Sequence, residues 1–265
     1  NSHLFFILLS NMNANNQISV VINTYNASKH LDEVLESVAD FDEVLVCDME
    51  STDDTVAIAE RHGCRVVTFP KEHHVSAEPA RTFAIQSAKS KWVLVVDADE
   101  LVTSELHDYL YAIIQQPNCP HGLYIPRRNR VMNVLNRGRL SDYQLRFLIR
   151  EGTIWPPYVH TFPIVNGNVQ KLKDNNMAVL IHLDENYLYE RIEKTNRYTD
   201  GEVSKKADKH YGIGALLWRP VWRFFKAYIM DRGYASGFPG FVSSVIDGFY
   251  QFLLVAKIIE KRKYK

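Results

Sequence analysis

The sequence predicts an α/β fold with a mainly parallel central sheet, because short β-branched runs alternate with helical periodicity along its first hundred residues. Three observations support this: apolar runs of strand length, amphipathic stripes between them, and polar residues directly after the runs. The expected strands are 18–22, 43–47, 65–69 and 92–96. A chain of 265 residues is long enough for one large domain with an appendage.

Helices are expected between these strands. Apolar residues at 31, 34, 35 and 38 recur at i, i+3, i+4 and i+7, which predicts a helix with Ser28 as its N-cap. The segment 51–54 resembles a capping box ahead of a second helix. Small residues over 80–88 predict a third helix, and the leucines and isoleucines of 106–114 predict a fourth. After residue 120 we expect short strands and long loops.

The two ends of the chain differ in charge although the formal net charge is zero. Residues 204–265 hold 12 Lys or Arg against 4 Asp or Glu, which leaves 19 basic and 27 acidic residues in the first 203. A basic, aromatic-rich tail favours an anionic membrane surface as partner, and we expect no nucleic acid. The alternative is a solvated surface of mixed sign.

The tail is expected to form helices that lie on a membrane or dip into it. From residue 216 onward it is rich in Trp, Phe, Tyr and Leu, but Pro220, Gly233, Gly237, Pro239 and Gly240 interrupt it. No uninterrupted run of about 18 apolar residues exists, so a membrane-spanning helix is not predicted. The alternative is a C-terminal subdomain with ordinary core helices.

We therefore divide the chain into an N-terminal extension (1–15), a main domain (16–195) and a helical, basic and aromatic region (196–265). The apolar run 4–9 is too short to span a bilayer or to form a convincing signal peptide. Cys47, Cys64 and Cys119 are odd in number and lack metal-ligand spacing, so we expect them to be reduced and structural, in a cytosolic compartment.

Acidic residues follow the fourth expected strand as Asp97-Ala98-Asp99-Glu100. In an open α/β sheet, ligands bind beyond the carboxyl ends of the strands. Two carboxylates one residue apart can share a hard divalent cation, Mg²⁺ or Mn²⁺, whose remaining positions are filled by phosphate oxygens and water. The alternative is a solvated turn.

Polar residues also follow the first two strands, as Asn23 to Asn26 and as Asp48 to Asp53. Parallel strands bring all these residues to the same edge of the sheet, so one cleft is expected. Asn26, Ser51 and Asp53 could instead be turn and N-cap residues.

Several motifs follow one another in a fixed order along the chain. They are 20–26, 47–55, 80–84, 96–100, 125–129, 142–146, 159–160, 219–220 and 237–241. These motifs resemble those of family 2 glycosyltransferases with the GT-A fold. Within that family the chain most resembles bacterial enzymes of lipopolysaccharide core and related envelope glycan synthesis. The resemblance runs from about residue 17 onward and is specific for the family but not for the substrate.

The resemblance implies an inverting transferase that uses a nucleotide-diphosphate sugar, with a UDP-hexose as the expected donor. Thr24, Tyr25 and Asp48 would hold the uracil and ribose, Arg81 would approach the diphosphate, and Asp97 would position the donor. The remaining members of the implied donor set are Asn26, Ser51 and Asp53. The implied metal ligands are Asp97, Asp99 and His160.

The resemblance also implies an acceptor side, for a lipid-linked or lipopolysaccharide-core glycan at the cytoplasmic face of a bacterial plasma membrane. Asp142 is the expected catalytic base, with a structural salt bridge to Arg146 as the alternative. An acceptor platform is expected from aromatic faces and arginines. Its candidate residues are Arg127, Arg128, Trp155 and Tyr158.

The chain departs from the family pattern at two places. Thr161 follows His160 where relatives commonly have Glu, so the role of that glutamate is lost or moved. Met49 and Glu50 stand where many relatives have Asp-Gly or Ser-Gly, which would alter the nucleotide pocket.

Other classes of protein fit less well. A haloacid-dehalogenase-like phosphatase needs Thr where Leu101 stands, and a Rossmann dehydrogenase or a sugar-phosphate nucleotidyltransferase needs a glycine-rich loop after the first strand. The main rival is a non-catalytic, membrane-associated protein that binds a sugar nucleotide or glycan.

Overall fold

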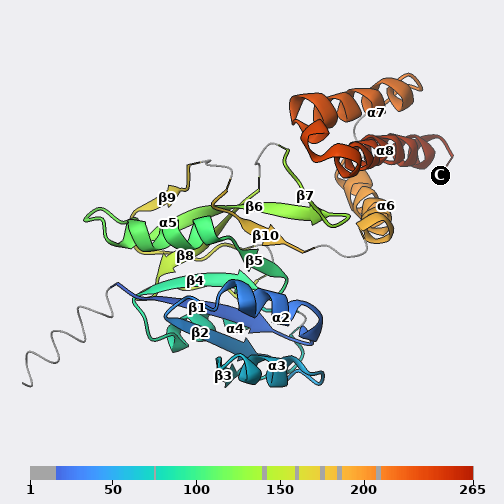
Figure 1. The fold of residues 1–265 in the computed structure, drawn as a ribbon. Coiled ribbons are helices and arrows are strands. Elements are labelled where there is room, and N and C mark those ends of the chain that lie inside the picture. Colours follow the sequence, from blue (N-terminus) through green and yellow to red (C-terminus); the bar gives the residue numbers. More distant parts are fainter. Residues whose placement is uncertain are drawn as a thin grey trace, which may run out of the picture. The chain divides into compact units, whose positions relative to one another are not determined.

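The computed structural model describes residues 16–74, 76–138, 142–158, 161–173, 177–183, 187–206 and 210–264. The chain folds into two compact units (Figure 1). The first unit takes the residues up to 127 together with 140–183, and the second takes 128–139 together with 184–265. The expected domain boundary after residue 195 falls within helix α6 (Tyr187–Lys205).

Four parallel strands form one half of the sheet in the first unit, in the order β3-β2-β1-β4. All four were predicted, and three of them run one or two residues further than their apolar runs, to end on a polar residue. Their bounds are β1 (Ile18–Thr24), β2 (Glu43–Asp48), β3 (Arg65–Thr68) and β4 (Trp92–Asp97). The polar residues that end β1, β2 and β4 therefore belong to the strands, and the pairing of the strands decides which of them are neighbours.

The sheet continues from β4 through β8 (Tyr143–Ile149), which is antiparallel to it, and then through β6, β10 and β5. These strands are β6 (Gly122–Val131), β10 (Leu180–His182) and β5 (Glu100–Val102), and β9 (Val169–Lys171) pairs with β6. This mixed half brings residues from distant parts of the sequence beside the end of β4.

Helices cover both faces of the sheet, because alternate residues of each strand point to opposite sides. Val20 and Ile22 pack with α2 (Ser28–Ser37), α3 (Thr55–Arg61) and α5 (Ser104–Ile114). Val21 packs with α4 (Glu78–Ser87) on the other face. Each fully buried aliphatic side chain contributes about 1.5–3 kcal/mol. The result is the predicted α/β/α sandwich.

Two predicted helix caps are wrong. Ser28 is the first residue of α2, and its backbone N–H donates to the Asp53 carboxylate at 3.1 Å, while the N-cap position is Ala27. At α3 the Asp54 N-cap forms no side-chain cap bond, and Asp53 accepts from the Thr55 backbone N–H at 3.0 Å. The Asp53 carboxylate thus accepts hydrogen bonds from the amino ends of both α2 and α3. The two helices are distant in the sequence, so a local pattern does not predict this arrangement.

The described residues of the second unit are mainly helical. Its strands are the end of β6 and β7 (Val134–Leu135), which pair with each other. Its helical elements are α6 (Tyr187–Lys205), α7 (Ala215–Phe225), η1 (Lys226–Met230), η2 (Gly233–Ser236) and α8 (Gly237–Lys263). α6 and α7 both pack against α8.

α8 corrects the expectation that glycines and proline break the tail. Pro239 lies in the first turn of the helix, where its missing N–H would have no intrahelical partner. Among the described residues, the stretch Gly233–Lys263 is long and apolar enough to cross a membrane, with a mean hydropathy of 1.5 over an 18-residue window. The expectation that Pro239 and Gly240 interrupt the tail is therefore wrong, because α8 runs through both residues.

Candidate functional site

A cavity of about 560 Å³ opens in the first unit, at the carboxyl ends of β1 and β4. The ladder explains its position, because Asn23 in β1 is paired with Asp97 in β4 and Thr24 is paired with Asp48 in β2. Six of the predicted donor and metal residues line it, and they are Thr24, Tyr25, Asn26, Arg81, Asp97 and Asp99. Further lining residues include Asn23, Lys29, His30, Met49, Lys71, Ser76 and His182.

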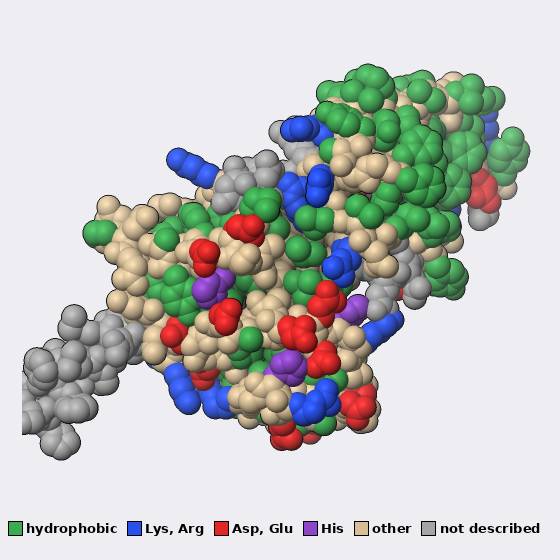
Figure 2. All heavy atoms as spheres, viewed as in Figure 1, with side chains coloured by type: hydrophobic (Ala, Val, Ile, Leu, Met, Phe, Trp, Pro, Cys, Tyr) green, Lys and Arg blue, Asp and Glu red, His purple; other side chains and the backbone are tan. Residues whose placement is uncertain are grey.

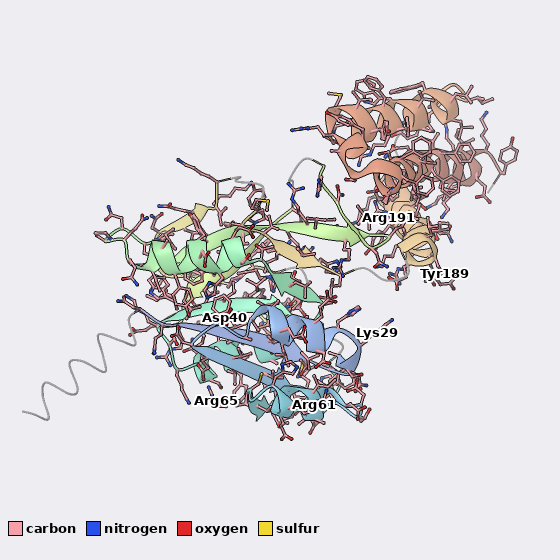
Figure 3. The ribbon with its side chains drawn as sticks, viewed as in Figure 1. Lys29, Asp40, Arg61, Arg65, Tyr189 and Arg191 are labelled. Atoms are coloured by element: carbon pink, nitrogen blue, oxygen red, sulfur yellow. The ribbon has the colours of Figure 1, made fainter. Side chains whose placement is uncertain are left out.

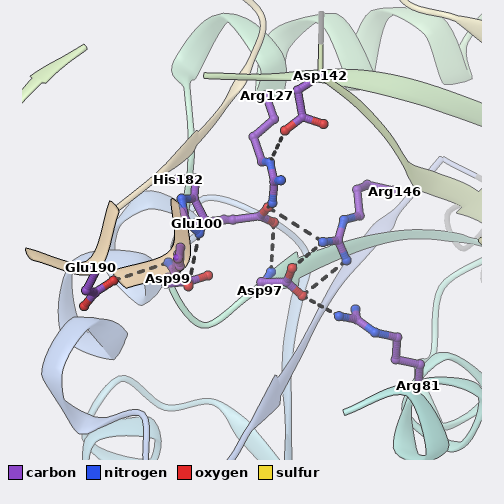
Figure 4. A network of polar contacts seen from close by, with 10 residues as sticks. Arg81, Asp97, Asp99, Glu100, Arg127, Asp142, Arg146, His182 and Glu190 are labelled. Carbon is purple, nitrogen blue, oxygen red and sulfur yellow. Dashed lines mark hydrogen bonds and ion pairs between the residues drawn. The ribbon is translucent and has the colours of Figure 1, made fainter. Parts of the chain in front are cut away.

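Asp97 is held by two buried arginines (Figure 4). Arg81 Nη2 donates to its Oδ1 at 2.7 Å, and Arg146 bonds to both of its carboxylate oxygens. Burial alone would raise the pKa of Asp97, but the guanidinium groups of Arg146 and Arg81 hold it well below its ordinary value. Asp97 is therefore a permanent anion in this structure. Its role as a metal ligand stays a prediction.

The ionic network continues away from the cavity. Glu100 is fully buried, accepts from the Asp97 backbone N–H at 3.1 Å, and lies 3.1 Å from Arg127 Nη1 and 3.7 Å from Arg146 Nη2. Burial raises its pKa. Arg127 Nε donates in turn to Asp142 Oδ2 at 2.8 Å. Positive and negative side chains thus alternate from Arg81 to Asp142 (Figure 4).

Asp142 has a different salt-bridge partner from the one that the sequence suggested, and its role as the catalytic base stays a prediction. Its salt-bridge partner is Arg127, and Arg146 pairs with Asp97 and Glu100, so the expected Asp142–Arg146 bridge is wrong. The Gln144 side-chain amide donates to its second oxygen at 2.7 Å. Asp142 is not among the residues that line the cavity, although about a third of its side chain is exposed.

Asp99 and His182 face each other at the cavity. Asp99 Oδ2 lies 3.4 Å from His182 Nε2, and this bond raises the pKa of His182. The antiparallel register of β5 and β10 pairs His182 with Glu100, which explains the proximity. Sequence reasoning missed His182, because only the pairing of two short, distant strands brings it there. The predicted ligand His160 lies outside the described residues.

The donor atoms at this position suit a divalent ion only in part. Among the residues that the structure describes, no group of three or more His, Cys, Asp or Glu is arranged to hold a metal. Asp99 and His182 supply one oxygen and one nitrogen donor, whereas the oxygens of Asp97 are taken by arginines. Mg²⁺ is commonly held by one or two carboxylates plus phosphate oxygens. The residues therefore fit an ion whose coordination a diphosphate completes.

Asp48 and Ser51 connect the loops beside the cavity. Asp48 is buried and accepts from Thr24 Oγ1 at 2.8 Å, from Ser51 Oγ at 2.6 Å and from the Ser51 backbone at 2.8 Å. Ser51 Oγ accepts from the Asn26 backbone N–H at 2.8 Å, where Asn26 has a φ of 48°. Neither Asp48 nor Ser51 lines the cavity. Their donor contacts stay predictions, and what the structure shows is loop organisation.

Asp53 also organises these loops and does not line the cavity. The slight burial of its carboxyl would raise its pKa, but hydrogen bonds from Thr55 and Ser28 lower it to about 2. Its donor contact likewise stays a prediction.

Tyr25 and Lys71 form a cation–π pair on the cavity wall. The Lys71 ammonium lies 4.6 Å from the centre of the Tyr25 ring, and the tyrosine is about half exposed. An exposed ring can stack on a planar base, and an ammonium suits a phosphate. Lys71 follows Pro70 in an unremarkable loop, so the sequence carried no signal for it.

The burial of Trp155 contradicts its predicted role in an acceptor platform. It is 6 % exposed, and the guanidinium groups of Arg81 and Arg146 lie 4.5 and 5.7 Å from its ring centre. It therefore packs against the arginines that hold Asp97. Tyr158, by contrast, is 70 % exposed. The aromatic residues of this segment suggested a binding surface for the acceptor. The Trp155 ring instead packs against Arg81 and Arg146.

The two arginines predicted for the acceptor side are both engaged within the protein. Arg127 bridges Glu100 and Asp142. Arg128 belongs to the second unit, where it is buried and its Nη1 donates to the carbonyls of Asn136 and Gly138 at 2.8 and 2.9 Å. Adjacent residues of a strand point to opposite sides, which separates their roles.

The chain is similar over most of its length to proteins described as glycosyltransferases. A Rickettsia bellii protein described as an uncharacterized glycosyltransferase is 33 % identical over 92 % of this chain and 86 % of its own length. The lipopolysaccharide core biosynthesis glycosyltransferase LpsC of Rhizobium meliloti is 23 % identical, with 94 % of each chain covered. Residues 1–349 of TarS from S. aureus share the fold, with a TM-score of 0.51, 17 % identity and coverage of 94 % and 93 %.

The model of the family described as "Glycosyl transferase family 2" matches residues 19–164. This range contains the four parallel strands except Ile18, and all but one of the residues discussed at the cavity. The exception is His182. The GT-A fold agrees with this match, as do the relatives. The chain is a member of glycosyltransferase family 2 and uses a nucleotide-sugar donor.

Proposed function

We propose that the protein transfers a sugar, with inversion, from a UDP-hexose to a lipid-linked or lipopolysaccharide-core glycan in bacterial envelope synthesis. The observation that supports it best is the cavity at the carboxyl edge of the sheet, where Tyr25, Lys71, Arg81 and Asp99 converge. The likeness to LpsC, named for lipopolysaccharide core biosynthesis, supports the acceptor class. A UDP complex of TarS, which has the same fold, supports the donor class.

In this proposal the nucleotide lies along the cavity wall. The exposed Tyr25 ring stacks on the base, while Lys71 and Arg81 meet the diphosphate. Asp99 and His182 would hold a divalent cation, Mn²⁺ or Mg²⁺, which would neutralise charge on the leaving diphosphate. Asp97 fixes Arg81 and Arg146 at the rear of the site, so that the charged groups are ordered before the donor arrives.

We assign the base to Asp142. Its carboxylate takes the proton of the acceptor hydroxyl as that oxygen attacks the anomeric carbon and the bond to the diphosphate breaks. Arg127 and Gln144 bond one oxygen each and fix the orientation of the carboxylate. This assignment is supported by the Asp142 carboxylate being partly exposed while two hydrogen bonds fix its orientation.

The acceptor class places the protein at a membrane. We propose that it is cytoplasmic and peripheral on the inner face of the bacterial plasma membrane, where anionic lipids meet its basic tail. The long apolar helix α8 supports an association with lipid.

A panel of UDP- and GDP-sugars tests this function. Purified protein is titrated with each sugar nucleotide in the presence of Mn²⁺, and release of the nucleoside diphosphate is followed. We expect one UDP-hexose to be preferred and turned over. Binding of UDP-sugars without any turnover, even with lipid-linked acceptor extracts, would favour the non-catalytic sugar-nucleotide binder instead.

A further inference from the structure

α7 presents an apolar stripe that no described residue of its unit covers. Its members recur at i, i+1, i+4, i+5 and i+8, which is one side of a helix. Their exposed fractions run from 46 % to 73 %, so the stripe faces outward along its whole length. The residues are Leu217, Trp218, Val221, Trp222 and Phe225.

α8 carries a second stripe of the same kind. Its residues recur at i, i+3, i+7, i+11 and i+14 and are 40 % to 67 % exposed. They are Phe238, Phe241, Val245, Phe249 and Phe252. Phe241 also contacts the rings of Phe224 and Tyr228, so the aromatic side chains are continuous from one helix to the other. Figure 2 shows the resulting apolar surface over α7 and α8. We call the ten residues of the two stripes the apolar face.

Close helix packing explains why these large side chains are outside. Gly240, Ser244 and Gly248 of α8 are buried at intervals of four residues. A Cβ atom on Gly248 would lie 2.9 Å from the Pro220 carbonyl oxygen of α7, and one on Gly240 would lie 1.9 Å from that of Gly233. Small residues that let helix backbones approach are typical of helices packed within lipid.

α7 and α8 pack against each other as a helical hairpin. The polar residues of this hairpin lie along a different side from the apolar face. Arg223 of α7 and Arg191 of α6 each bond one oxygen of Asp247, at 2.8 and 2.9 Å, and Arg219 donates to Gln251 at 3.0 Å. Arg191 is labelled on α6 in Figure 3. Each helix of the hairpin is therefore divided lengthwise into a polar side and an exposed apolar side.

These contacts argue against a crossing helix. Asp247 lies near the middle of the stretch Gly233–Lys263, so in a transmembrane orientation it would sit near the bilayer centre. Its partner Arg191 would be drawn in with α6, which has eight charged residues among nineteen. Basic residues instead mark an interfacial position, with Lys261, Arg262 and Lys263 in the last turn of α8.

We propose that the apolar face is the membrane-docking surface: α7 and α8 lie in one leaflet of an anionic bilayer, with the face among the acyl chains and the Asp247 ion pairs toward water. This rests on the proposed membrane-bound acceptor and adds the surface and mode of attachment. Trp and Phe on one side with Lys and Arg at the helix ends match the apolar and anionic layers of a leaflet.

Tryptophan fluorescence offers a direct test. The chain has four tryptophans, of which Trp218 and Trp222 lie on the apolar face, while Trp92 and Trp155 are 3 % and 6 % exposed in the first unit. Full-length protein is mixed with vesicles of phosphatidylcholine and phosphatidylglycerol, with or without lipids brominated at shallow or deep acyl positions. We expect flotation with these vesicles, weaker flotation with phosphatidylcholine alone, and stronger quenching by the shallow bromines.

Two variants and a matched control assign the effect to the face. Val221→Glu and Phe238→Glu each replace a side chain that is 67 % exposed, and we expect vesicle partitioning to fall at least about tenfold. Ile164→Glu makes the same change at a residue of the first unit that is 64 % exposed, and it should leave partitioning unchanged.

Vesicle binding is measured without donor or acceptor, so its outcome does not depend on whether the chain releases UDP. The proposal is overturned if the wild type does not float, or if deep bromines quench as strongly as shallow ones, as for a crossing helix. A wild type that is a dimer by sedimentation and becomes monomeric in both face variants would also overturn it, since a second copy would then cover the face.

Discussion

The two units treat charged and apolar side chains in opposite ways. In the first, Arg81 and Arg146 are 8 % and 5 % exposed and pair with the carboxylate of Asp97, and Arg146 also lies beside the fully buried Glu100. In the second, large aromatic side chains such as Trp218 and Trp222 stand more than half exposed. Burying ion pairs, as in the first unit, costs desolvation energy, and it is useful where charged groups must be held in fixed positions. Exposed apolar surface, as in the second unit, marks a site where a lipid or protein partner displaces water.

The largest effect is expected at the centre of the ion network. Arg146→Ala removes the partner that Asp97 and the fully buried Glu100 share, so the free energy of unfolding should fall by about 3–5 kcal/mol. Denaturant unfolding measures it. The exposed Arg61→Ala serves as control and should change the value by less than about 0.5 kcal/mol. Equal losses in the two variants would mean that the network contributes nothing special to the first unit.

In the second unit the corresponding weak point is close packing. Gly248→Ala places a methyl group 2.9 Å from the Pro220 carbonyl oxygen, and we expect a loss of about 1–3 kcal/mol in thermal unfolding. Gly212→Ala is the matched control, because no heavy atom lies within 4 Å of its added Cβ. If both variants unfold at the wild-type temperature, the hairpin is looser than described.

A smaller effect on rate, without loss of the fold, is expected from Arg127. Arg127→Ala removes the bond that orients Asp142, so kcat should fall about tenfold while KM for the donor stays near its wild-type value. Arg127→Lys should recover part of the loss. A raised donor KM with unchanged kcat would instead place Arg127 in donor binding and weaken the assignment of Asp142.

The smallest effect should be a pH dependence at Asp53. Its carboxylate has a pKa of about 2 in the folded protein, below the ordinary value, so its stabilisation is fully present above about pH 4 and is lost as the pH falls toward 2. Asp53→Asn should therefore lower stability at neutral pH by less than about 1 kcal/mol, since the group is exposed. Unfolding curves of variant and wild type should converge near pH 2, and a constant gap would contradict the linkage.

Much of the donor side of this site could be predicted from sequence, because it depends on strand order. Parallel strands end at one edge, so Thr24, Tyr25, Asp97 and Asp99 could be placed together from strand order. Arg81 was assigned to the site only by the resemblance to family 2 glycosyltransferases. The three cysteines are indeed unpaired.

Features that depend on long-range pairing could not be predicted. His182 reaches Asp99 only through the β5–β10 ladder, and the partner of Asp142 is decided by which arginine of two neighbouring strands points toward it. Trp155 shows the same limit, since its burial follows from two arginines on other elements. The local composition of the tail also gave a wrong expectation for α8. Glycines can end a helix, but in α8 they allow close packing against neighbouring segments.

The central claim is that Asp99 at the cavity helps to bind a sugar nucleotide through a divalent ion. Calorimetric titration of UDP with and without Mn²⁺ tests it in wild type, Asp99→Asn and the control Asp108→Asn, whose side chain is 82 % exposed and does not line the cavity. We predict that Mn²⁺ tightens UDP binding at least about tenfold in wild type and Asp108→Asn, and has no effect in Asp99→Asn. Equal Mn²⁺ dependence in all three proteins would contradict the account.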